Sequence, residues 1–219
     1  MISENEIKEL VPSTSKLGFY LYDTMSDEHL VINENDWFPL ASISKLLTAI
    51  MGLLKNPNIE REVIIDSISK HCGNSYKKIM ETISDDEINL NLKKLNIDIH
   101  VLENNQDKVT NRGTAKGVFE VLHGLLDGTL LSNHPKELII EALKLQNDRD
   151  GFRFRKEYNW IHMTGGIDGV CNDVGYLEFG NRKVIIIGLL ETQDPNVEWY
   201  QLECTLHEIG KYIMKACKA

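Results

Sequence analysis

The stretch FPLASISK, residues 38–45, decides how the rest of the chain is interpreted. It ends an extended segment, Asp36–Leu40, in which Pro39 restricts the backbone and disfavours a helix. A helix is predicted next, over Ser42–Leu54, because its apolar side chains recur three and four residues apart. These apolar positions are Ile43, Leu46, Leu47, Ile50 and Leu54. The pattern places Ser42 at the start of a strongly apolar helix, with Lys45 one turn further along the same face.

A serine three residues before a lysine at a helix start is a pairing with chemical consequences. The lysine amine can take the proton of the hydroxyl, and the helix N-terminus favours negative charge that develops there. The Ser-x-x-Lys pattern alone carries little information, because it occurs at Ser13/Lys16, Ser42/Lys45, Ser67/Lys70 and Ser75/Lys78. Of these four serines, Ser42 opens a long apolar helix directly after an extended segment. We interpret the other three as surface serines near solvated lysines.

Before this stretch, the sequence predicts a short helix and a β-hairpin. Ser3 and Glu6 fit a capping box, so a helix is expected from there to about Leu10. Short runs of β-forming residues at Leu17–Asp23 and His29–Asn33 flank a polar turn and predict the hairpin.

After this stretch, the chain is first helical and then mostly strand-forming. Helices are expected over five segments, Ile59–Ser69, Ser75–Thr82, Asp85–Leu95, Thr114–Leu126 and Ser132–Leu145. Strands are expected over Trp160–Thr164, Gly175–Phe179 and Lys183–Leu190, with the turn signal Gly180-Asn181 between the last two. A further helix is expected from Trp199 to Ala216.

This order of elements predicts an α/β fold. The economical arrangement is an antiparallel sheet made from both chain ends, flanked by the N- and C-terminal helices, with an inserted all-helical lobe. We expect a single domain over residues 1–219, with a sheet lobe at about 1–40 and 158–219. The helical lobe is expected at about 41–157.

Composition narrows the classes of function. The 219 residues carry 24 Lys and Arg against 33 Asp and Glu, and this formal charge of −9 argues against nucleic acid as a partner. Four cysteines without a C-x-x-C pair and seven scattered histidines predict neither a disulfide scaffold nor a metal site, and we expect no cofactor. Acidic first residues and short apolar runs predict a cytoplasmic protein without membrane insertion, unless an export signal has been removed. The oligomeric state is left open.

A second informative stretch is HMTGGIDG, residues 162–169. Two adjacent glycines at the end of a strand let the backbone approach a ligand closely and present N–H groups as hydrogen-bond donors. Taken alone, the same residues also fit a glycine-rich turn that leads into the hairpin.

Together, these stretches resemble a known family. Residues 38–45 resemble the nucleophile segment of class A β-lactamases and the related penicillin-binding serine hydrolases. Residues 162–169, continued by VCNDVG at 170–175, look like that family's Lys-Thr-Gly strand. Between them, residues 114–131 and the QNDRD segment at 146–150 resemble the family's helical stretch in order and spacing. The resemblance implies a β-lactamase/transpeptidase-like fold acting on a small-molecule or peptide-like acyl substrate.

The resemblance assigns roles to five residues. Ser42 matches the nucleophile that becomes acylated, and Lys45 matches the base that activates it. Thr164 and Gly165 match the last two positions of the third motif, where the threonine orients the substrate. The backbone N–H groups of Ser42 and Gly166 match the oxyanion hole, which stabilises the tetrahedral intermediate.

The second motif of the family, Ser-Asp-Asn, is best matched by Cys72-Gly73-Asn74. Asn74 is kept and would orient the substrate. Cys72 would have to pass the proton to the leaving group, or that proton shuttle is absent.

The third motif and the deacylation machinery also depart from the family. Met163 stands where the family has a lysine, and a thioether cannot pair with a substrate carboxylate. The deacylating glutamate has no secure counterpart in the sequence. Glu103 is a candidate for it, and Asn111 is a comparable candidate for holding a water.

Two hypotheses follow from these matches and losses. The intact Ser42/Lys45 pair favours a serine acyl hydrolase that handles β-lactams poorly. The substitutions at Cys72 and Met163 favour instead a catalytically decayed relative that serves as a binding or regulatory protein.

Overall fold

The computed structural model describes residues 2–102, 111–154 and 158–217. Its centre is a five-stranded sheet in the order β2-β1-β8-β7-β6, in which every neighbouring pair is antiparallel. The strands are β1 (Ser15–Asp23), β2 (His29–Ile32), β6 (Asn159–Ile167), β7 (Val170–Phe179) and β8 (Arg182–Thr192). The expected α/β fold with a sheet drawn from both chain ends is therefore confirmed.

The pairing of β1 with β8 joins the two ends of the chain. Its register runs from Ser15 opposite Thr192 to Asp23 opposite Val184. This contact places an N-terminal hairpin and a C-terminal meander in one sheet, as the sequence predicts.

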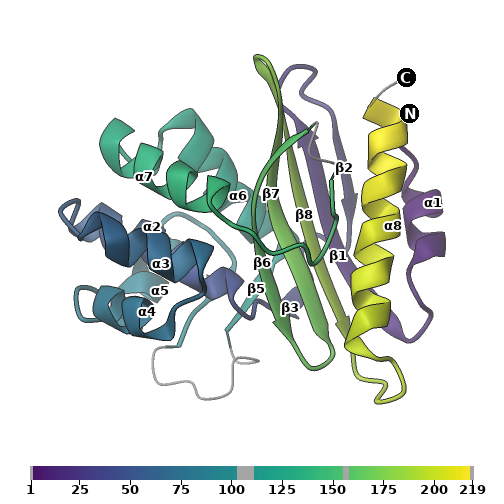
Figure 1. Ribbon diagram of the computed structural model, residues 1–219, viewed down its shortest axis with the longest axis horizontal. Helices are drawn as coiled ribbons and strands as arrows, with labels where there is room; N and C mark the ends of the chain where they lie inside the picture. Colours follow the sequence, from purple (N-terminus) through teal and green to yellow (C-terminus); the bar gives the residue numbers. More distant parts are fainter. Residues whose placement is uncertain (1, 103–110, 155–157, 218–219) are drawn as a thin grey trace.

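One face of the sheet is covered by the two terminal helices, α1 (Glu4–Leu10) and α8 (Trp199–Cys217), at the right of Figure 1. A core forms between them and the strands, where Ile7 of α1 and Leu206 of α8 are fully buried. The backbone N–H of Ser3 donates to the Tyr212 hydroxyl at 2.9 Å and ties α1 to α8.

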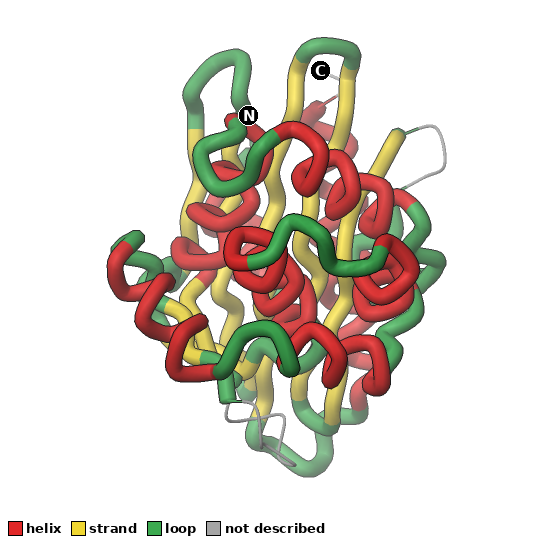
Figure 2. The backbone as a smooth tube through the Cα atoms, turned by 90° about the vertical axis from the view of Figure 1, so that its left-hand side faces the viewer, coloured by secondary structure: helices red, strands yellow, loops and turns green. Residues whose placement is uncertain are grey.

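The opposite face carries the inserted helices, which lie toward the viewer in Figure 2. They are α2 (Ile43–Lys55), α3 (Arg61–Ser69), α4 (Gly73–Met80), α5 (Asp85–Lys94), α6 (Ala115–Asp127) and α7 (Asn133–Lys144). Helix α2 is the most buried, with eleven of its thirteen residues inside the core. This burial explains why residues 46–54 are almost uniformly apolar.

A second, three-stranded sheet accompanies these helices in the order β3-β5-β4. Its strands are β3 (Trp37–Pro39), β4 (Ile99–His100) and β5 (Arg112–Thr114). The sequence predicted β3 as an extended segment but did not predict β4 or β5. Strands of two or three residues are too short to show an alternating pattern, and their partners are distant in sequence.

Of three local predictions, one is wrong, one is confirmed and one gave a strand that is too short. The Ser3 side chain makes no capping hydrogen bond, so the predicted capping box is wrong, whereas Ser84 and Glu87 form a complete one. Gly128 ends α6 in the left-handed conformation at φ 83°, as its position predicted. Strand β7 begins at Val170 rather than Gly175, because hydrogen bonds satisfy polar side chains that interrupt its apolar pattern.

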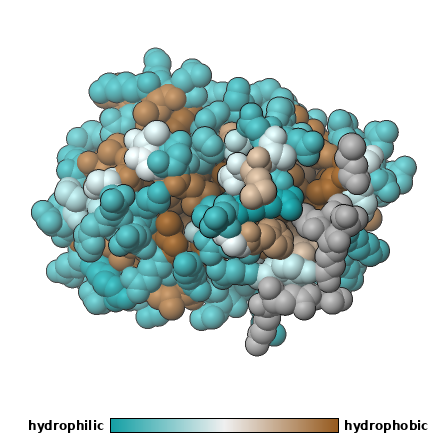
Figure 3. Space-filling model, turned by 90° about the horizontal axis from the view of Figure 1, so that it is seen from above, coloured by the Kyte–Doolittle hydropathy of each residue, from teal (hydrophilic) through white to brown (hydrophobic). Residues whose placement is uncertain are grey.

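The outer surface is mainly polar. Seen from above, hydrophilic residues predominate and the apolar ones emerge between them (Figure 3). None of the described helices combines the length and the apolarity that crossing a membrane requires.

Candidate active site

The turn into α2 presents the Ser42 hydroxyl. Ala41 adopts φ 47°, a left-handed conformation that alanine rarely takes, and turns the chain sharply out of β3. Ser42 already has helical angles, φ −68° and ψ −12°, and its side chain caps no backbone N–H. Its oxygen instead accepts a hydrogen bond from Lys45 Nζ at 3.2 Å. A serine at this position commonly uses its oxygen to cap the helix, whereas here the hydroxyl faces Lys45.

Lys45 is almost completely enclosed. Lys45 and Ser42 are each 8% exposed, and Lys45 Nζ lies 5.7 Å from the centre of the Tyr76 ring. The pair predicted from the sequence is therefore assembled inside the protein.

Several contacts hold this turn in place. The Asn172 side chain donates to the Pro39 carbonyl at 2.8 Å, and the Leu40 N–H donates to the Asn111 carbonyl at 2.8 Å. Gly165 of β6 packs directly against the turn, since a Cβ atom there would lie 2.9 Å from the Leu40 carbonyl oxygen. The third motif thus positions the nucleophile segment through backbone contact.

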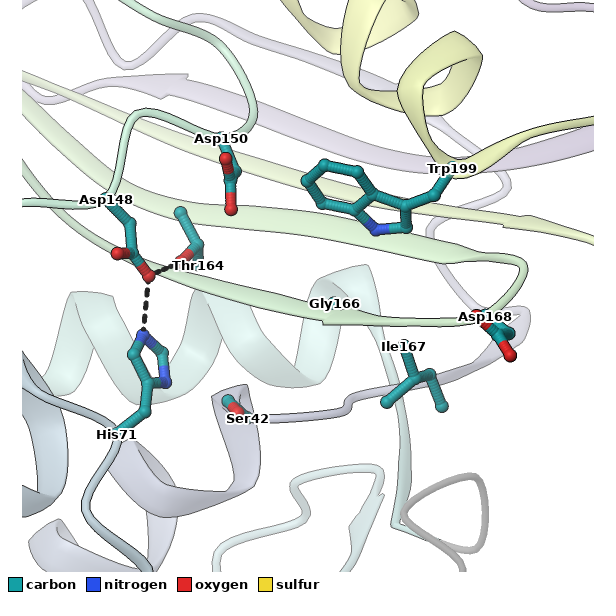
Figure 4. Close-up of a pocket in the computed structure, with 9 residues that line it drawn as sticks. All are labelled: Ser42, His71, Asp148, Asp150, Thr164, Gly166, Ile167, Asp168 and Trp199. Carbon is teal, nitrogen blue, oxygen red and sulfur yellow. Dashed lines mark hydrogen bonds and ion pairs between the residues drawn. The ribbon is translucent and has the colours of Figure 1, made fainter.

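A cavity of about 360 Å³ opens in front of Ser42 (Figure 4). Strand β6 forms one wall with Thr164, Gly166 and Ile167, and Asp168 follows in the turn to β7. The remaining lining residues come from three other segments and are His71, Asp148, Asp150 and Trp199.

The backbone at Gly166 is suited to bind an oxyanion. Strand β6 is the last strand of the large sheet, so its outward N–H groups face no further strand. Among the described residues, the N–H of Ser42 also has no backbone or side-chain acceptor. Two backbone donors on the rim of one cavity can together stabilise a tetrahedral oxyanion.

A hydrogen-bonded group lies on one side of the cavity. Thr164 Oγ1 donates to Asp148 Oδ2 at 3.0 Å, and His71 Nε2 lies 3.1 Å from the same oxygen. The His71 backbone is left-handed at φ 52°, and its imidazole also lies 2.8 Å from Gln146 Nε2. The imidazole is thus held on the cavity wall by the loop that follows α7.

Asp150 and Trp199 form the upper part of the cavity in Figure 4. Burial raises the pKa of the Asp150 carboxyl, and the negative charges of Asp148 and Glu203 raise it further. The Trp199 indole donates to the Val170 carbonyl at 3.1 Å and packs over Gly166.

A buried network behind β6 anchors the loop that carries the two aspartates. Asp173 is fully buried and lies 2.7 Å from His162 Nδ1. The same carboxylate accepts from the Phe152 N–H at 3.0 Å and from the Trp160 indole at 3.3 Å. This carboxylate joins β6 and β7 to the segment after Asp150.

The structure brings together the predicted site residues of the first motif and the matching residues of the third motif. Ser42, Thr164 and Gly166 line the cavity, Lys45 bonds to Ser42, and Gly165 packs against the turn.

Other predicted residues lie elsewhere. Met163 is fully buried in the core between the sheet and the helices, so its side chain does not reach the cavity. Asn74 is exposed on α4, and Cys72 precedes that helix, and neither residue lines the cavity. The Ser75 hydroxyl and the N–H groups of Ser75 and Asn74 lower the pKa of the Cys72 thiol.

Of the two candidates for deacylation, the structure describes Asn111 but not Glu103. Glu103 lies outside the described residues. The Asn111 side chain accepts from the Leu102 N–H at 2.7 Å and donates to Ser44 Oγ at 3.3 Å, so it is engaged in holding the chain.

Six cavity residues were not predicted as site residues: His71, Asp148, Asp150, Ile167, Asp168 and Trp199. Ile167 and Asp168 directly follow the predicted glycine pair. The two aspartates in the loop at 146–150 could have indicated a site, because a charged segment between a helix and a strand can border a cleft. His71 and Trp199 gave no signal, since the fold alone brings them to Ser42. Within the described residues, no group of His, Cys, Asp or Glu side chains is arranged to hold a metal ion.

Comparisons with known proteins identify the family and the fold. A sequence model described as the Beta-lactamase enzyme family matches residues 74–217, well over half of the chain. The match begins after Ser42 and Lys45. Beta-lactamase 3 of Bacillus cereus is 24% identical over 247 residues, covering 93% of this chain and 78% of that protein.

Solved structures share the fold over nearly the whole chain. A β-lactamase from Chitinophaga pinensis has a TM-score of 0.86 at 15% identity, covering 97% of this chain and 98% of the other. A mutant of PBP-A, described as an acyl-enzyme complex with penicillin G, has a TM-score of 0.84 at 15% identity, covering 98% and 95%. Fold, motif order and sequence match agree, and the chain belongs to the Beta-lactamase enzyme family.

Proposed function

We propose that this protein is a serine acyl hydrolase that works through an acyl-enzyme on Ser42. The observation that carries the proposal is the 3.2 Å contact between Ser42 Oγ and Lys45 Nζ at the head of α2, inside a cavity edged by Gly166. Membership of the family supports hydrolase chemistry, and its relatives include proteins named as β-lactamases.

The reaction has two stages. With Lys45 as a neutral amine, the Ser42 proton passes to Nζ while Oγ forms a bond to the substrate carbonyl carbon. The oxyanion is held by the N–H groups of Ser42 and Gly166, and its collapse breaks the bond to the leaving group, which takes up a proton. Water then attacks the ester carbonyl carbon, the bond to Ser42 Oγ breaks, and one proton of the water goes to Oγ as the acid is released. The proton held by Lys45 replaces the one given to the leaving group, so that the site returns to its starting state.

We propose His71 as the group that protonates the leaving atom. The sequence pointed to Cys72 for this step, but the imidazole of the preceding residue is the side chain that lines the cavity. Its Nε2 atom lies 3.1 Å from Asp148 Oδ2, so the ring is held at the cavity wall where a leaving group would pass. Asn74 and Cys72 do not line the cavity and take no direct part in this step.

Activity on β-lactams should be poor. No lysine or arginine is among the described residues that line the cavity, and Met163 occupies the position of the expected lysine. A penicillin carboxylate would therefore enter a cavity without a basic partner from the third motif.

The test is covalent labelling of the intact protein. Wild type and Ser42→Ala are incubated separately with a fluorophosphonate and with a penicillin, and intact mass is followed over time. We expect a Ser42-dependent fluorophosphonate adduct within minutes, and with penicillin a slow adduct or none.

Two outcomes would contradict the proposal. If neither reagent gives a Ser42-dependent adduct in a protein that remains folded, the catalytically decayed relative is the better description. Rapid turnover of penicillin would instead support the serine hydrolase and contradict the prediction that it acts poorly on β-lactams.

A further inference from the structure

We infer that the acyl substrate of this cavity carries a positive charge, such as an ammonium or guanidinium group, close to the bond that is cleaved. The inference rests on the proposed function, because it takes Ser42 as the reacting group. Its basis is the charge of the cavity: Asp148, Asp150 and Asp168 line the same space as the nucleophile.

The three carboxylates differ in whether they already form hydrogen bonds or ion pairs within the protein. Asp148 is occupied, since Thr164 and His71 both contact its Oδ2 atom. In the described part of the chain, Asp150 and Asp168 form neither a hydrogen bond nor an ion pair. Two acids with unused acceptors therefore border the cavity.

Basic groups neutralise this charge only in part. The Arg153 guanidinium pairs with Glu203 and lowers the pKa of Asp150 by less than burial and the neighbouring acids raise it, and the Arg149 side chain does not line the cavity. Lys45 lies beneath Ser42 and is the proposed base, and His71 faces Asp148. The cavity wall is left with more negative than positive charge, and burial and neighbouring acids hold the Asp150 pKa above its ordinary value.

The positions of these groups suggest where the cation would bind. In Figure 4 the Asp150 carboxylate points down into the cavity, and the Trp199 ring lies between Asp150 and Asp168. An aromatic face beside carboxylates is a favourable environment for ammonium and guanidinium groups. A substrate with its carbonyl at Ser42 and Gly166 could extend its cationic end toward Asp150.

The experiment compares three fluorophosphonates that differ in one terminal group. The tails end in trimethylammonium, in uncharged tert-butyl of the same shape, or in carboxylate. Each forms the bond from Ser42 Oγ to phosphorus with release of fluoride, and the second-order labelling rate is read by intact mass. Ser42→Ala is the blank for all three.

We expect the trimethylammonium probe to react at least about tenfold faster than tert-butyl, the ratio given by one contact of ~1.4 kcal/mol. The carboxylate probe should be slowest. Asp150→Asn should reduce the ratio of the trimethylammonium rate to the tert-butyl rate several-fold. Asp86→Asn removes one exposed charge on α5, outside the cavity, and should leave every ratio unchanged.

The outcomes separate this inference from the proposed function. Equal rates for the three probes, or fastest labelling by the carboxylate probe, would overturn the cationic substrate and leave the serine hydrolase intact. A cation preference that is the same in Asp150→Asn and Asp86→Asn would also overturn it, because general protein charge would then explain the effect. If none of the three probes labels Ser42, both the proposed function and this inference are contradicted.

Discussion

Ser42 shows how a single residue is prepared for chemistry by its backbone. Its helical angles follow the left-handed Ala41, and they prevent the side chain from bending back to cap α2. The hydroxyl is then within 3.2 Å of Lys45, whose amine is enclosed by the core. The reactivity of Ser42 should therefore depend on this one amine.

Replacing Lys45 tests that dependence. Lys45→Met keeps the length and removes the amine, so fluorophosphonate labelling of Ser42 should slow by about 10²–10⁴-fold, the usual contribution of a general base. The fold should tolerate methionine, since the site is 8% exposed. Lys55→Met at the exposed end of the same helix, where Lys55 pairs with Glu87, is the control and should label at the wild-type rate. An unchanged rate in Lys45→Met would exclude this lysine as the base.

Asp150 provides a test that depends on pH. Its pKa is raised in the folded protein, first by burial and then by Asp148 and Glu203. A raised carboxyl pKa contributes stability below the unfolded pKa, and this contribution is lost as pH rises through the folded value. At neutral pH the ionised Asp150 therefore destabilises the fold.

Asp150→Asn should accordingly raise the Tm at pH 7, by up to about 2 °C because the carboxyl is partly solvated. The difference from wild type should disappear near pH 3, where the carboxyl is protonated in both the folded and the unfolded protein. Thermal unfolding of both proteins across this range is the measurement. An Asp150→Asn variant that is less stable than wild type at pH 7 would show that the carboxylate has a structural role.

At the scale of elements, the site depends on the close approach of β6 to the start of α2. Gly165 makes this approach possible, since two of the three atoms that a side chain would meet first are backbone atoms of Leu40 and Ile43. Backbone cannot move aside as a flexible side chain can. The two motifs that the sequence showed separately are thus one structural unit.

Gly165→Ala should disrupt that unit. A Cβ atom would lie 2.9 Å from the Leu40 carbonyl oxygen and 3.1 Å from the Ile43 nitrogen, so the turn must shift. We expect a loss of about 1–3 kcal/mol in unfolding free energy, together with slower labelling of Ser42. Denaturant unfolding and labelling are measured on the same preparation. Gly73→Ala, where a Cβ would meet nothing within 4 Å, is the matched control and should unfold like wild type. Full labelling in a stable Gly165→Ala variant would contradict the coupling.

At the scale of the molecule, two hydrophobic cores share one sheet. One lies under α1 and α8, and the other lies under the inserted helices. Because β1 and β8 contribute to both faces, we propose that the lobes unfold together as a single domain.

Core substitutions on opposite faces test this proposal. Ile7→Ala on α1 and Ile50→Ala on α2 each remove a fully buried side chain and should cost about 2–4 kcal/mol. Each should lower one common Tm by roughly 4–16 °C. Far-ultraviolet circular dichroism and Ser42 labelling, followed through the same transition, should coincide in both variants. Two separated transitions would show that the lobes are independent.

Elements with long local patterns were predictable from the sequence. The apolar spacing of residues 43–54 predicted α2, and the glycine-asparagine turn predicted the β7–β8 hairpin, because these signals are local. The Ser42/Lys45 pair was also predictable, since one helical turn fixes the distance between its members. The short strands β4 and β5 were missed because two or three residues show no pattern.

Tertiary structure decided what surrounds Ser42. His71, Asp148, Asp150 and Trp199 come from segments that are far apart in sequence, and they meet only because the sheet and the inserted helices pack together. The same packing buried Met163 in the core and left Asn74 on the surface, although both stood in motif positions. A local pattern fixes which residues share a helix face or a turn. The charge and the occupants of a cavity depend on contacts between distant segments, which no local pattern contains.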